Sequence, residues 1–330
     1  MPPERDERVA GERADSATAG TPPTVVTVGG AMVDHQYALS NLPEPDGGAY
    51  VRDEREGFGG VAANVASALT RLGRSTGVVT RLGEDDRGDA ALADLRDRGI
   101  DTERVRRGPE QSTYSMVLRA DDERMVITGG ESCAALRPRA GDRKYLSRAE
   151  AVAVTAYTPD AMTAAVVEAR EDGTVTRCSF DLSGPLAELR DRGTEPRTVD
   201  RAIAACDLLV AGEVALSAYC DHHGADDPIA LLRERGVERA ALTRGEEGAT
   251  LLTPEDTVDV DAFAVETVDP TGAGDAFHAG LVDAWLLDGR DPADAGAFAA
   301  AVAALNCTGE GARGALPTRE AARELVRERS

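Results

Sequence analysis

The residues with the clearest chemical potential lie in one stretch near the C-terminal end of the sequence. Residues 269–275 read D-P-T-G-A-G-D, and the residues that follow carry apolar side chains at the three- and four-residue steps of a helix. A turn of small residues that opens a helix leaves backbone N–H groups free at the positive end of the helix dipole, where phosphate groups bind. Asp275 lies at the mouth of this turn and could accept a proton from a hydroxyl beside a bound phosphate. Taken alone, the stretch also fits a glycine-rich loop with an Asp cap.

A second glycine-rich stretch, residues 59–66, reads G-G-V-A-A-N-V-A. The two stretches together resemble the N-terminal G-G-x-x-x-N and C-terminal D-T-x-G-A-G-D-x-F signatures of the ribokinase-like (PfkB) carbohydrate and nucleoside kinases, in that family's order. The resemblance covers about residues 24–328. It implies an α/β fold, a three-layer α/β/α sandwich with a mostly parallel central sheet and a small β-lid.

The resemblance also implies roles for individual residues. Phosphoryl transfer would be carried out by the C-terminal signature, with Asp275 as the base and an anion site at Gly272, Ala273 and Gly274. Sugar hydroxyls would be bound by Asp34, Gly59, Gly60 and Asn64. ATP, accompanied by Mg²⁺, would lie against Thr243, Gly245, Gly248 and Asn306. A monovalent cation such as K⁺ would be held at Asp269, Thr271 and Gly311.

The sequence departs from the family at the position tied to Mg²⁺. Many members carry N-x-x-E after the strand that corresponds to residues 207–210, whereas this chain has Gly212-Glu213-Val214-Ala215. Both named side chains are therefore missing. Either Glu213 substitutes for them, or ATP and water alone hold the metal, since Mg²⁺ often keeps several water ligands.

The elements that must position these residues alternate between strand and helix. Residues 24–29 are a β-branched run that ends in glycine, typical of a buried first strand, and Asp34 follows where α/β proteins bind ligands. A helix is expected over residues 60–72. Further strand–helix pairs follow between residues 77 and 243, and this rhythm predicts a mostly parallel sheet with helices on both faces.

Two insertions are expected to form the lid, at about residues 36–58 and 110–130. The first is polar and contains one short strand over residues 49–52; the second has the pattern of a hairpin. The kinase domain would span residues 24–330. Residues 1–23 are charged, rich in Pro, Ala and Thr, and lack an apolar core, which predicts a disordered acidic tail.

The net charge of −22 is unusual, and Lys144 is the only lysine. A lysine-poor acidic surface is typical of proteins that work in high salt, and a GC-rich genome would also favour Arg over Lys; a halophilic archaeon would satisfy both. The absence of a basic stripe argues against nucleic acid as a partner, and the absence of a long apolar segment argues against a membrane. Five scattered cysteines without a C-x-x-C pair indicate reduced cytoplasmic thiols.

The sequence therefore predicts a phosphotransferase that moves the γ-phosphoryl group of ATP to a hydroxyl of a sugar or nucleoside. A sugar phosphate or a keto-sugar acid stays open as the acceptor, and relatives often form homodimers through their lids. A non-catalytic regulator that binds a sugar or nucleotide is the rival hypothesis; loss of the catalytic Asp would be its signature, and Asp275 is present. A Rossmann dehydrogenase is excluded because residues 28–33, V-G-G-A-M-V, do not match G-x-G-x-x-G.

The charge generates a first prediction. Because the −22 charge must be screened, activity and folding should require molar salt. Turnover and melting temperature, measured from about 50 mM to molar KCl, should both rise with salt. Full activity and an unchanged melting temperature at about 50 mM would contradict this expectation.

Overall fold

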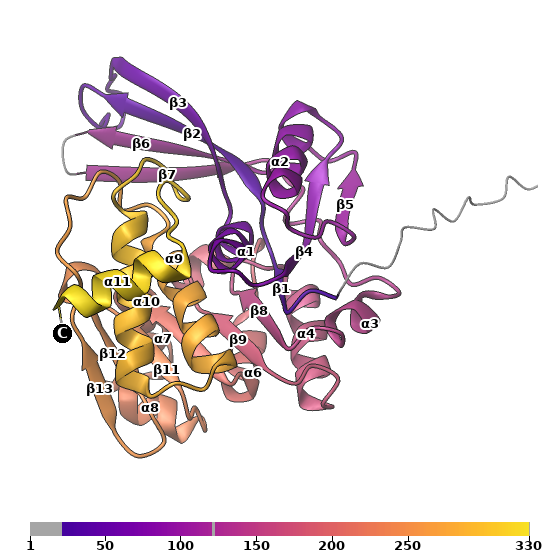
Figure 1. Cartoon of the computed structure of the whole chain (residues 1–330). Coiled ribbons are helices and arrows are strands. Elements are labelled where there is room, and N and C mark those ends of the chain that lie inside the picture. Colours follow the sequence, from indigo (N-terminus) through magenta and orange to yellow (C-terminus); the bar gives the residue numbers. More distant parts are fainter. Residues whose placement is uncertain (1–21, 121–122, 330) are drawn as a thin grey trace, which may run out of the picture.

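The computed structural model describes residues 22–120 and 123–329. They form a large sheet with helices on both faces, and a second, smaller sheet above one edge of this body (Figure 1). Apart from Pro22 and Pro23, the tail predicted over residues 1–23 lies outside the described residues. No helix within the described ranges is long and apolar enough to cross a membrane.

The large sheet has nine strands in the order β13-β12-β11-β10-β9-β8-β1-β4-β5. It is parallel from β5 to β11, and β12 and β13 are antiparallel additions at one edge. Its strands are β1 (Val25–Val28), β4 (Thr76–Gly83), β5 (Val105–Gly108), β8 (Ala151–Thr155), β9 (Cys178–Asp181), β10 (Leu208–Gly212), β11 (Ala240–Thr243), β12 (Ala249–Leu252) and β13 (Thr257–Val260). The predicted mostly parallel sheet is confirmed.

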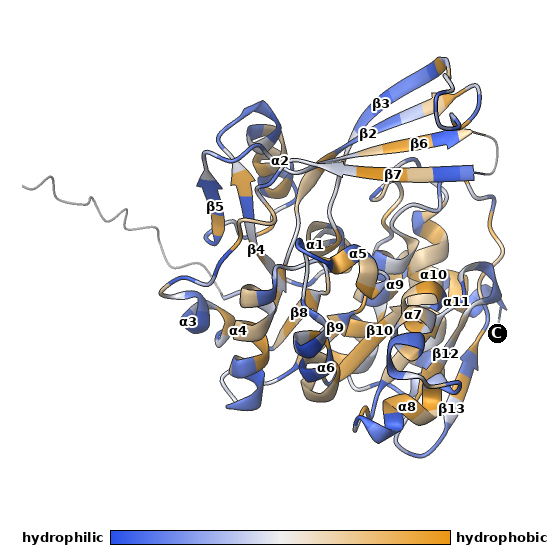
Figure 2. Ribbon diagram, turned by 180° about the vertical axis from the view of Figure 1, so that it is seen from behind, coloured by the Kyte–Doolittle hydropathy of each residue, from blue (hydrophilic) through white to orange (hydrophobic). Residues whose placement is uncertain are grey.

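Helices cover both faces of the sheet, and its central strands consist mainly of apolar residues (Figure 2). In β10, Leu208 and Val210 pack toward one helical layer, while Leu209 and Ala211 pack toward the other. The first layer contains α1 (Val61–Arg71), α9 (Ala273–Leu281), α10 (Pro292–Asn306) and α11 (Arg319–Arg329). The second contains α4 (Asp160–Glu171), α6 (Pro196–Ala205), α7 (Glu213–His223) and α8 (Pro228–Glu234).

The remaining helices are peripheral or short. Helix α2 (Asp86–Asp97) packs with α1 and β4 in a small separate core. The others are α3 (Asp142–Leu146), α5 (Leu186–Leu189), the 3₁₀ turn η1 (Gly245–Glu247) and the π-helical turn η2 (Val282–Leu287).

The helix that follows the C-terminal signature is held from both sides. Gly280 of α9 lies against α10 so closely that a Cβ on it would be 2.6 Å from the Cα atom of Ala299. Just beyond α9, the fully buried Asp283 accepts a hydrogen bond from Arg74 Nε at 2.6 Å and another from Arg319. Because a buried carboxylate is stable only when paired, these two arginines fix the far end of the helix.

The smaller sheet is the predicted lid. Its strands are β2 (Met32–Leu39), β3 (Val51–Gly59), β6 (Tyr114–Ala120) and β7 (Glu123–Gly129), in the order β3-β2-β6-β7. Pairing is antiparallel except between β2 and β6, which run parallel. The first insertion holds two long strands instead of one short strand. The sequence hid β3 because this strand, V-R-D-E-R-E-G-F-G, is polar on both faces and shows no alternation.

The lid therefore begins at Met32, before residue 36, and Asp34 lies inside a lid strand. The sequence placed this carboxylate just beyond the end of the first strand. Its position in a strand means that hydrogen bonds of the lid sheet, in place of a flexible connection, fix the direction of its side chain.

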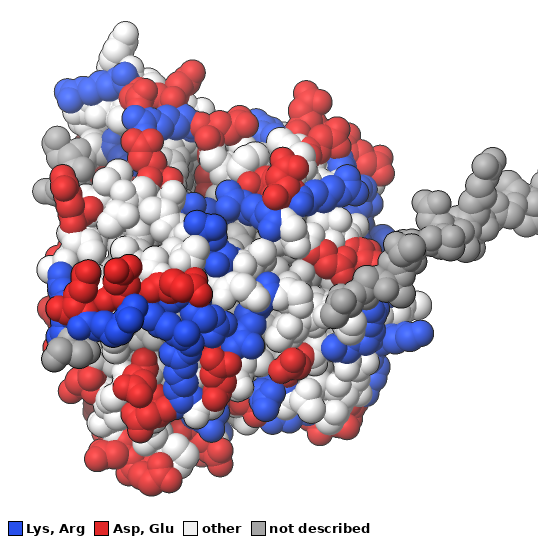
Figure 3. Space-filling view, viewed as in Figure 1, with Lys and Arg blue, Asp and Glu red and all other residues white. Residues whose placement is uncertain are grey.

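The surface carries interspersed acidic and basic groups, as one face of the molecule shows (Figure 3). Many arginines pair with carboxylates; Arg201 NH2, for example, lies 2.8 Å from Glu171 Oε2. Such exposed pairs contribute little to stability. Because acidic residues outnumber basic ones, the excess negative charge is left for salt to screen.

Candidate active site

The predicted anion site is formed by the turn at the start of α9. Gly272 precedes the helix with a φ of 78°, and a Cβ on it would be 2.2 Å from the carbonyl oxygen of Ala312. Across the described chain, the N–H groups of Gly272, Gly274 and Asp275 have no hydrogen-bond partner, whereas Ala273 N–H donates to Pro270 O at 3.2 Å. The free donors are thus Gly272, Gly274 and Asp275. Ala273, which was expected to contribute, already has a weak partner.

Asp275, the predicted base, has a carboxyl group suited to accept a proton near neutral pH. Desolvation by the surrounding protein raises its pKa to about 7, and the nearby charge of Asp181 adds to this effect. Asn64 Nδ2 donates to Asp275 Oδ2 at 2.7 Å, which opposes the rise. The residue keeps some solvent-exposed surface, so a hydroxyl could reach it. Burial thus makes this carboxylate more basic than that of an exposed aspartate.

Arg313 joins this carboxylate to the predicted sugar site, and sequence reasoning did not select it. Its Nε donates to Asn64 Oδ1 at 2.8 Å and its NH2 to Gly59 O at 2.9 Å. Its NH1 pairs with Asp94 of α2. Burial lowers the pKa of Arg313 to about 10. One sequence feature could have identified Arg313: it is the single cationic residue in the loop of residues 309–314, G-E-G-A-R-G.

Asp34 lies beside these groups, next to Gly59. It is buried and accepts a hydrogen bond from Ser115 Oγ at 2.5 Å. Burial raises the pKa of Asp34, although the charges of Arg313, His35 and Arg124 oppose this. The two predicted glycines permit this close packing. A Cβ on Gly59 would be 2.0 Å from Asp34 Oδ2, and one on Gly60, whose φ is 91°, would be 2.5 Å from Gly30 O.

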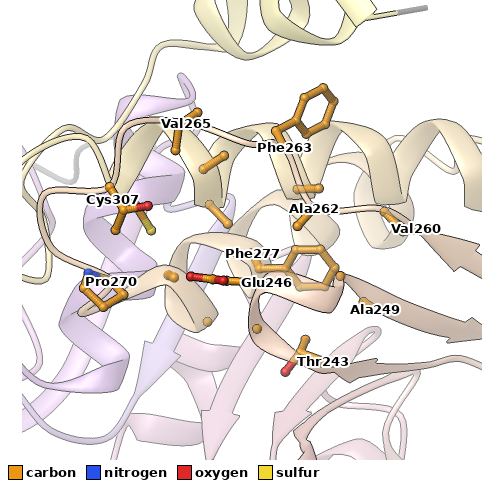
Figure 4. A pocket seen from close by; sticks show the side chains of 18 residues that line it. Thr243, Glu246, Ala249, Val260, Ala262, Phe263, Val265, Pro270, Phe277 and Cys307 are labelled. Atoms are coloured by element: carbon orange, nitrogen blue, oxygen red, sulfur yellow. The ribbon is translucent and has the colours of Figure 1, made fainter. Parts of the chain in front are cut away.

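Three of the four predicted nucleotide residues line a pocket that reaches the start of α9 (Figure 4). Thr243, Gly245 and Gly248 form one side of it. Gly248 has a φ of 83°, and a Cβ there would be 2.0 Å from Val260 O. The rest of the lining is mainly apolar, including Val260, Phe263, Val265, Phe277 and Cys307. An apolar slot that ends at free N–H groups fits a nucleotide, whose base is flat and whose phosphates are anionic.

Asn306 was expected to contact the nucleotide, and its position does not fit that role. It is fully buried and does not line the pocket. Its Nδ2 donates to Ala312 O at 3.2 Å and to Thr271 O at 3.4 Å. Asn306 therefore ties the loop of residues 309–314 to the turn before α9. The sequence could not show this contact, because Asn306 and Thr271 are 35 residues apart.

The residues predicted to hold a monovalent cation do come together, but they surround an arginine. Asp269 is buried and accepts hydrogen bonds from the N–H groups of Thr271 and Gly311, both at 2.9 Å. Arg119, from lid strand β6, pairs with Asp269 and donates to Thr271 Oγ1 at 2.6 Å. Burial alone would raise the pKa of Asp269; the hydrogen bonds from Arg119 and the two N–H groups hold it below its usual value.

The position tied to Mg²⁺ in relatives lies next to the nucleotide pocket. Gly212, Glu213 and Ala215 line a second pocket, which shares Thr243 and Gly245 with the first. Among the described residues there is no group of three or more His, Cys, Asp or Glu side chains that could hold a metal ion. This donor set fits Mg²⁺ bound mainly by phosphate and water, with Glu213 as the available carboxylate.

Comparison with known proteins agrees with this arrangement. The profile of the family described as pfkB family carbohydrate kinase matches residues 23–319, so the chain belongs to that family and is a phosphotransferase that acts on a hydroxyl of a sugar or nucleoside. An ATP-dependent ribose-1-phosphate kinase of Halopiger xanaduensis is 34% identical over 92% of this chain and 98% of its own. A nucleoside kinase of Methanothermobacter thermautotrophicus is 30% identical over 89% of this chain and 92% of its own.

Solved structures confirm the fold. The ribokinase of Thermotoga maritima superposes with a TM-score of 0.79 at 21% identity, over 92% of this chain and 99% of the other. The ribokinase of Arabidopsis thaliana, solved with ribose and ATP, superposes with a TM-score of 0.78 at 23% sequence identity, over 92% of this chain and 99% of the other. The relative from Halopiger, a halophilic archaeon, supports the halophilic origin expected from the charge.

Two glycines of the anion site should respond differently to the same substitution. Gly272→Val places a side chain in a left-handed conformation against Ala312 O, so it should lower stability by about 2 kcal/mol or more. Gly274 has no positive φ and a Cβ there meets no atom within 4 Å, so Gly274→Val should fold normally. It should nevertheless weaken ATP binding about tenfold or more, because its side chain enters the pocket next to the phosphate donors. Thermal melting and titration with a fluorescent nucleotide measure both effects; the reverse pattern would refute this account.

The raised pKa of Asp275 leads to a prediction about the pH dependence of activity. With a pKa of about 7, kcat/KM should lose about tenfold per pH unit below neutrality. Asp275→Asn should lower kcat by about 10²–10⁴-fold and abolish this acid limb, with the ATP Kd nearly unchanged. An Asn variant that kept more than about a tenth of wild-type turnover, with chemistry rate-limiting, would exclude Asp275 as the base.

The same substitution should affect stability in the opposite direction. Burial disfavours the ionised form of Asp275, so its cost to the folded state is absent below the unfolded pKa of about 4 and complete above the folded pKa of about 7. Asp275→Asn should therefore melt at a higher temperature than wild type at pH 8. The difference should shrink as the pH falls through 7 toward 4.

Proposed function

We propose that this kinase transfers the γ-phosphoryl group of ATP, with Mg²⁺, to a hydroxyl of ribose 1-phosphate. The observation that supports this choice of acceptor is an arginine of the lid that has no carboxylate partner among the described residues. Arg124 lies on lid strand β7, and its charge reaches the buried Asp34. Among the described residues, its guanidinium makes one hydrogen bond, from NH1 to Thr271 Oγ1 at 3.2 Å, and has no carboxylate partner. An acceptor that carries its own phosphate would supply that partner.

The other cations near Asp34 are less available to a ligand. Each nitrogen of the Arg313 guanidinium already has a protein partner, and Arg119 is paired with Asp269. The identity to a ribose-1-phosphate kinase over nearly the whole chain supports the same acceptor. A nucleoside is the second candidate, supported by the relative named nucleoside kinase.

In this mechanism the protein contributes position and charge, which are the main requirements of phosphoryl transfer. The adenine ring of ATP would lie in the apolar pocket. The γ-phosphate would accept hydrogen bonds from the free N–H groups of Gly272, Gly274 and Asp275. Asp34 would accept hydrogen bonds from acceptor hydroxyls. Mg²⁺, held by phosphate, water and Glu213, would neutralise charge on the phosphates.

The proton of the attacking hydroxyl would pass to Asp275. Its carboxylate is oriented by Asn64, and Asn64 in turn accepts a hydrogen bond from Arg313. Arg313 thus acts as a positioning residue for both the base and the Gly59 carbonyl group. The lid would close over the acceptor and exclude water, which otherwise competes for the phosphoryl group.

The remaining proposals concern setting and assembly. All five cysteines are free, which supports a reducing cytoplasm. Residues 24–330 are proposed as one kinase domain with the lid inserted. A homodimer through the lid is supported by the exposed apolar side chains Met125, Val126 and Ile127 on its edge strand β7. Sedimentation equilibrium in molar KCl tests the dimer.

Acceptor choice can be tested with two variants in a coupled ADP-release assay in molar KCl. Wild type should prefer ribose 1-phosphate to ribose, inosine and adenosine. Asp34→Ala should raise KM about ten- to a hundredfold for every acceptor it phosphorylates, with the ATP KM little changed. Arg124→Ala should raise KM by a similar factor for ribose 1-phosphate and leave nucleosides unaffected.

The contrary results are equally clear. Equal effects of Asp34→Ala on the acceptor and ATP KM values would remove Asp34 from the sugar site. A preference for nucleosides, with Arg124→Ala silent for all acceptors, would replace the first candidate with the second.

A further inference from the structure

The site that the family resemblance assigns to a monovalent cation contains a cationic side chain of this protein. Asp269, Thr271 and Gly311 surround the end of Arg119, which reaches them from lid strand β6. A guanidinium already paired with the carboxylate leaves no charge for K⁺ to neutralise. The residues present therefore do not fit a bound monovalent cation in this conformation.

The buried carboxylate explains why some cation must be there. Asp269 is 3% exposed, and an unpaired charge at such a depth is strongly destabilising. Its two N–H donors, Thr271 and Gly311, are dipoles and carry no net charge. Among the described residues, Arg119 is the partner that supplies a full positive charge.

The location of this pair couples it to the reaction. Asp269 and Thr271 lie one to three residues before Gly272, whose N–H is one of the free donors of the anion site. Gly311 belongs to the loop that packs against Gly272 through Ala312. A positive charge next to Asp269 therefore stabilises both segments that form the anion site, the turn before α9 and the loop of residues 309–314.

We propose that Arg119 replaces the monovalent cation, so that the lid itself supplies the positive charge behind the anion site. The site is then complete only when the lid is closed, because Arg119 belongs to the lid and Asp269 to the body. Chloride salts of K⁺, Na⁺ and choline should support activity alike once the general need for high ionic strength is met. The activity measurements rest on the kinase function proposed above; the cation-binding measurement does not.

The wild-type protein provides the first test without any substitution. Turnover measured at one high ionic strength should agree within about twofold in KCl, NaCl and choline chloride, since choline is too large for the site. A K⁺ preference over choline of more than about fivefold would overturn the proposal. Loss of turnover in all three salts would instead count against the proposed function.

Substitution of Arg119 should make turnover depend on an added monovalent cation. Arg119→Ala should lose about tenfold or more of kcat in choline chloride, and K⁺ or added guanidinium should restore much of it. Arg52→Ala is the matched control. Arg52 is an exposed lid residue of β3 whose side chain has no hydrogen bond or ion pair among the described residues, and its variant should behave like wild type in every salt. An Arg119→Ala enzyme that stays fully active in choline, or that no cation restores, would refute the replacement.

Direct binding separates this proposal from any effect on activity. Crystals kept in choline nitrate, which avoids insoluble TlCl and competing K⁺, and soaked with Tl⁺, an anomalous scatterer that substitutes for K⁺, should show no peak at Asp269 in wild type and a peak there in Arg119→Ala. A wild-type peak beside Asp269 would overturn the proposal. If the Ala variant does not fold, the wild-type salt series and Tl⁺ soak still decide the question.

Discussion

The buried charge of Asp269 is the constraint on which the active end of this molecule depends. Three segments that are distant in sequence meet at this carboxylate: the turn before α9, the loop of residues 309–314, and lid strand β6. A carboxylate at this depth must be satisfied from several directions, and each segment supplies one donor. The geometry of the anion site is therefore a consequence of satisfying one buried charge.

A second arginine organises the acceptor side by the same physical means. Arg313 is nearly fully buried and joins α2, α1 and the end of β3 through Asp94, Asn64 and Gly59. Its contact with Asn64 leaves that amide's Nδ2 pointing at Asp275. The result is a directed line of hydrogen bonds from a buried cation to the base. Desolvation makes this base more basic than a surface Asp, and the line of donors keeps its carboxylate in one orientation.

The charge distribution of the chain suits both its interior and its surroundings. With a single lysine, nearly every internal cation is an arginine, whose planar group can satisfy several acceptors at once. The buried pairs around Asp269, Asp283 and Asp94 all use this property. The acidic excess remains at the surface, where salt screens it.

The sequence by itself determined the architecture and the chemistry. The β-branched runs and helical periodicities around residues 25–243 predicted the parallel sheet, because burial on both faces leaves an apolar pattern that is local in sequence. The two glycine-rich signatures located Asp275, Asn64 and the anion turn, since backbone angles and close approaches restrict which residues can occupy those positions.

Only the tertiary structure decided which charges meet. Arg119 and Asp269 are 150 residues apart, and Arg313 lies 249 residues from Asn64, so no local pattern could pair them. The lid strand β3 was hidden for a related reason: both of its faces are polar, and its position follows from pairing with β2. Asn306 was assigned to the nucleotide from its place in the sequence, but burial turned its amide toward two carbonyl groups. Local patterns record backbone and burial preferences, whereas the pairing of buried charges depends on a fold that brings distant segments together.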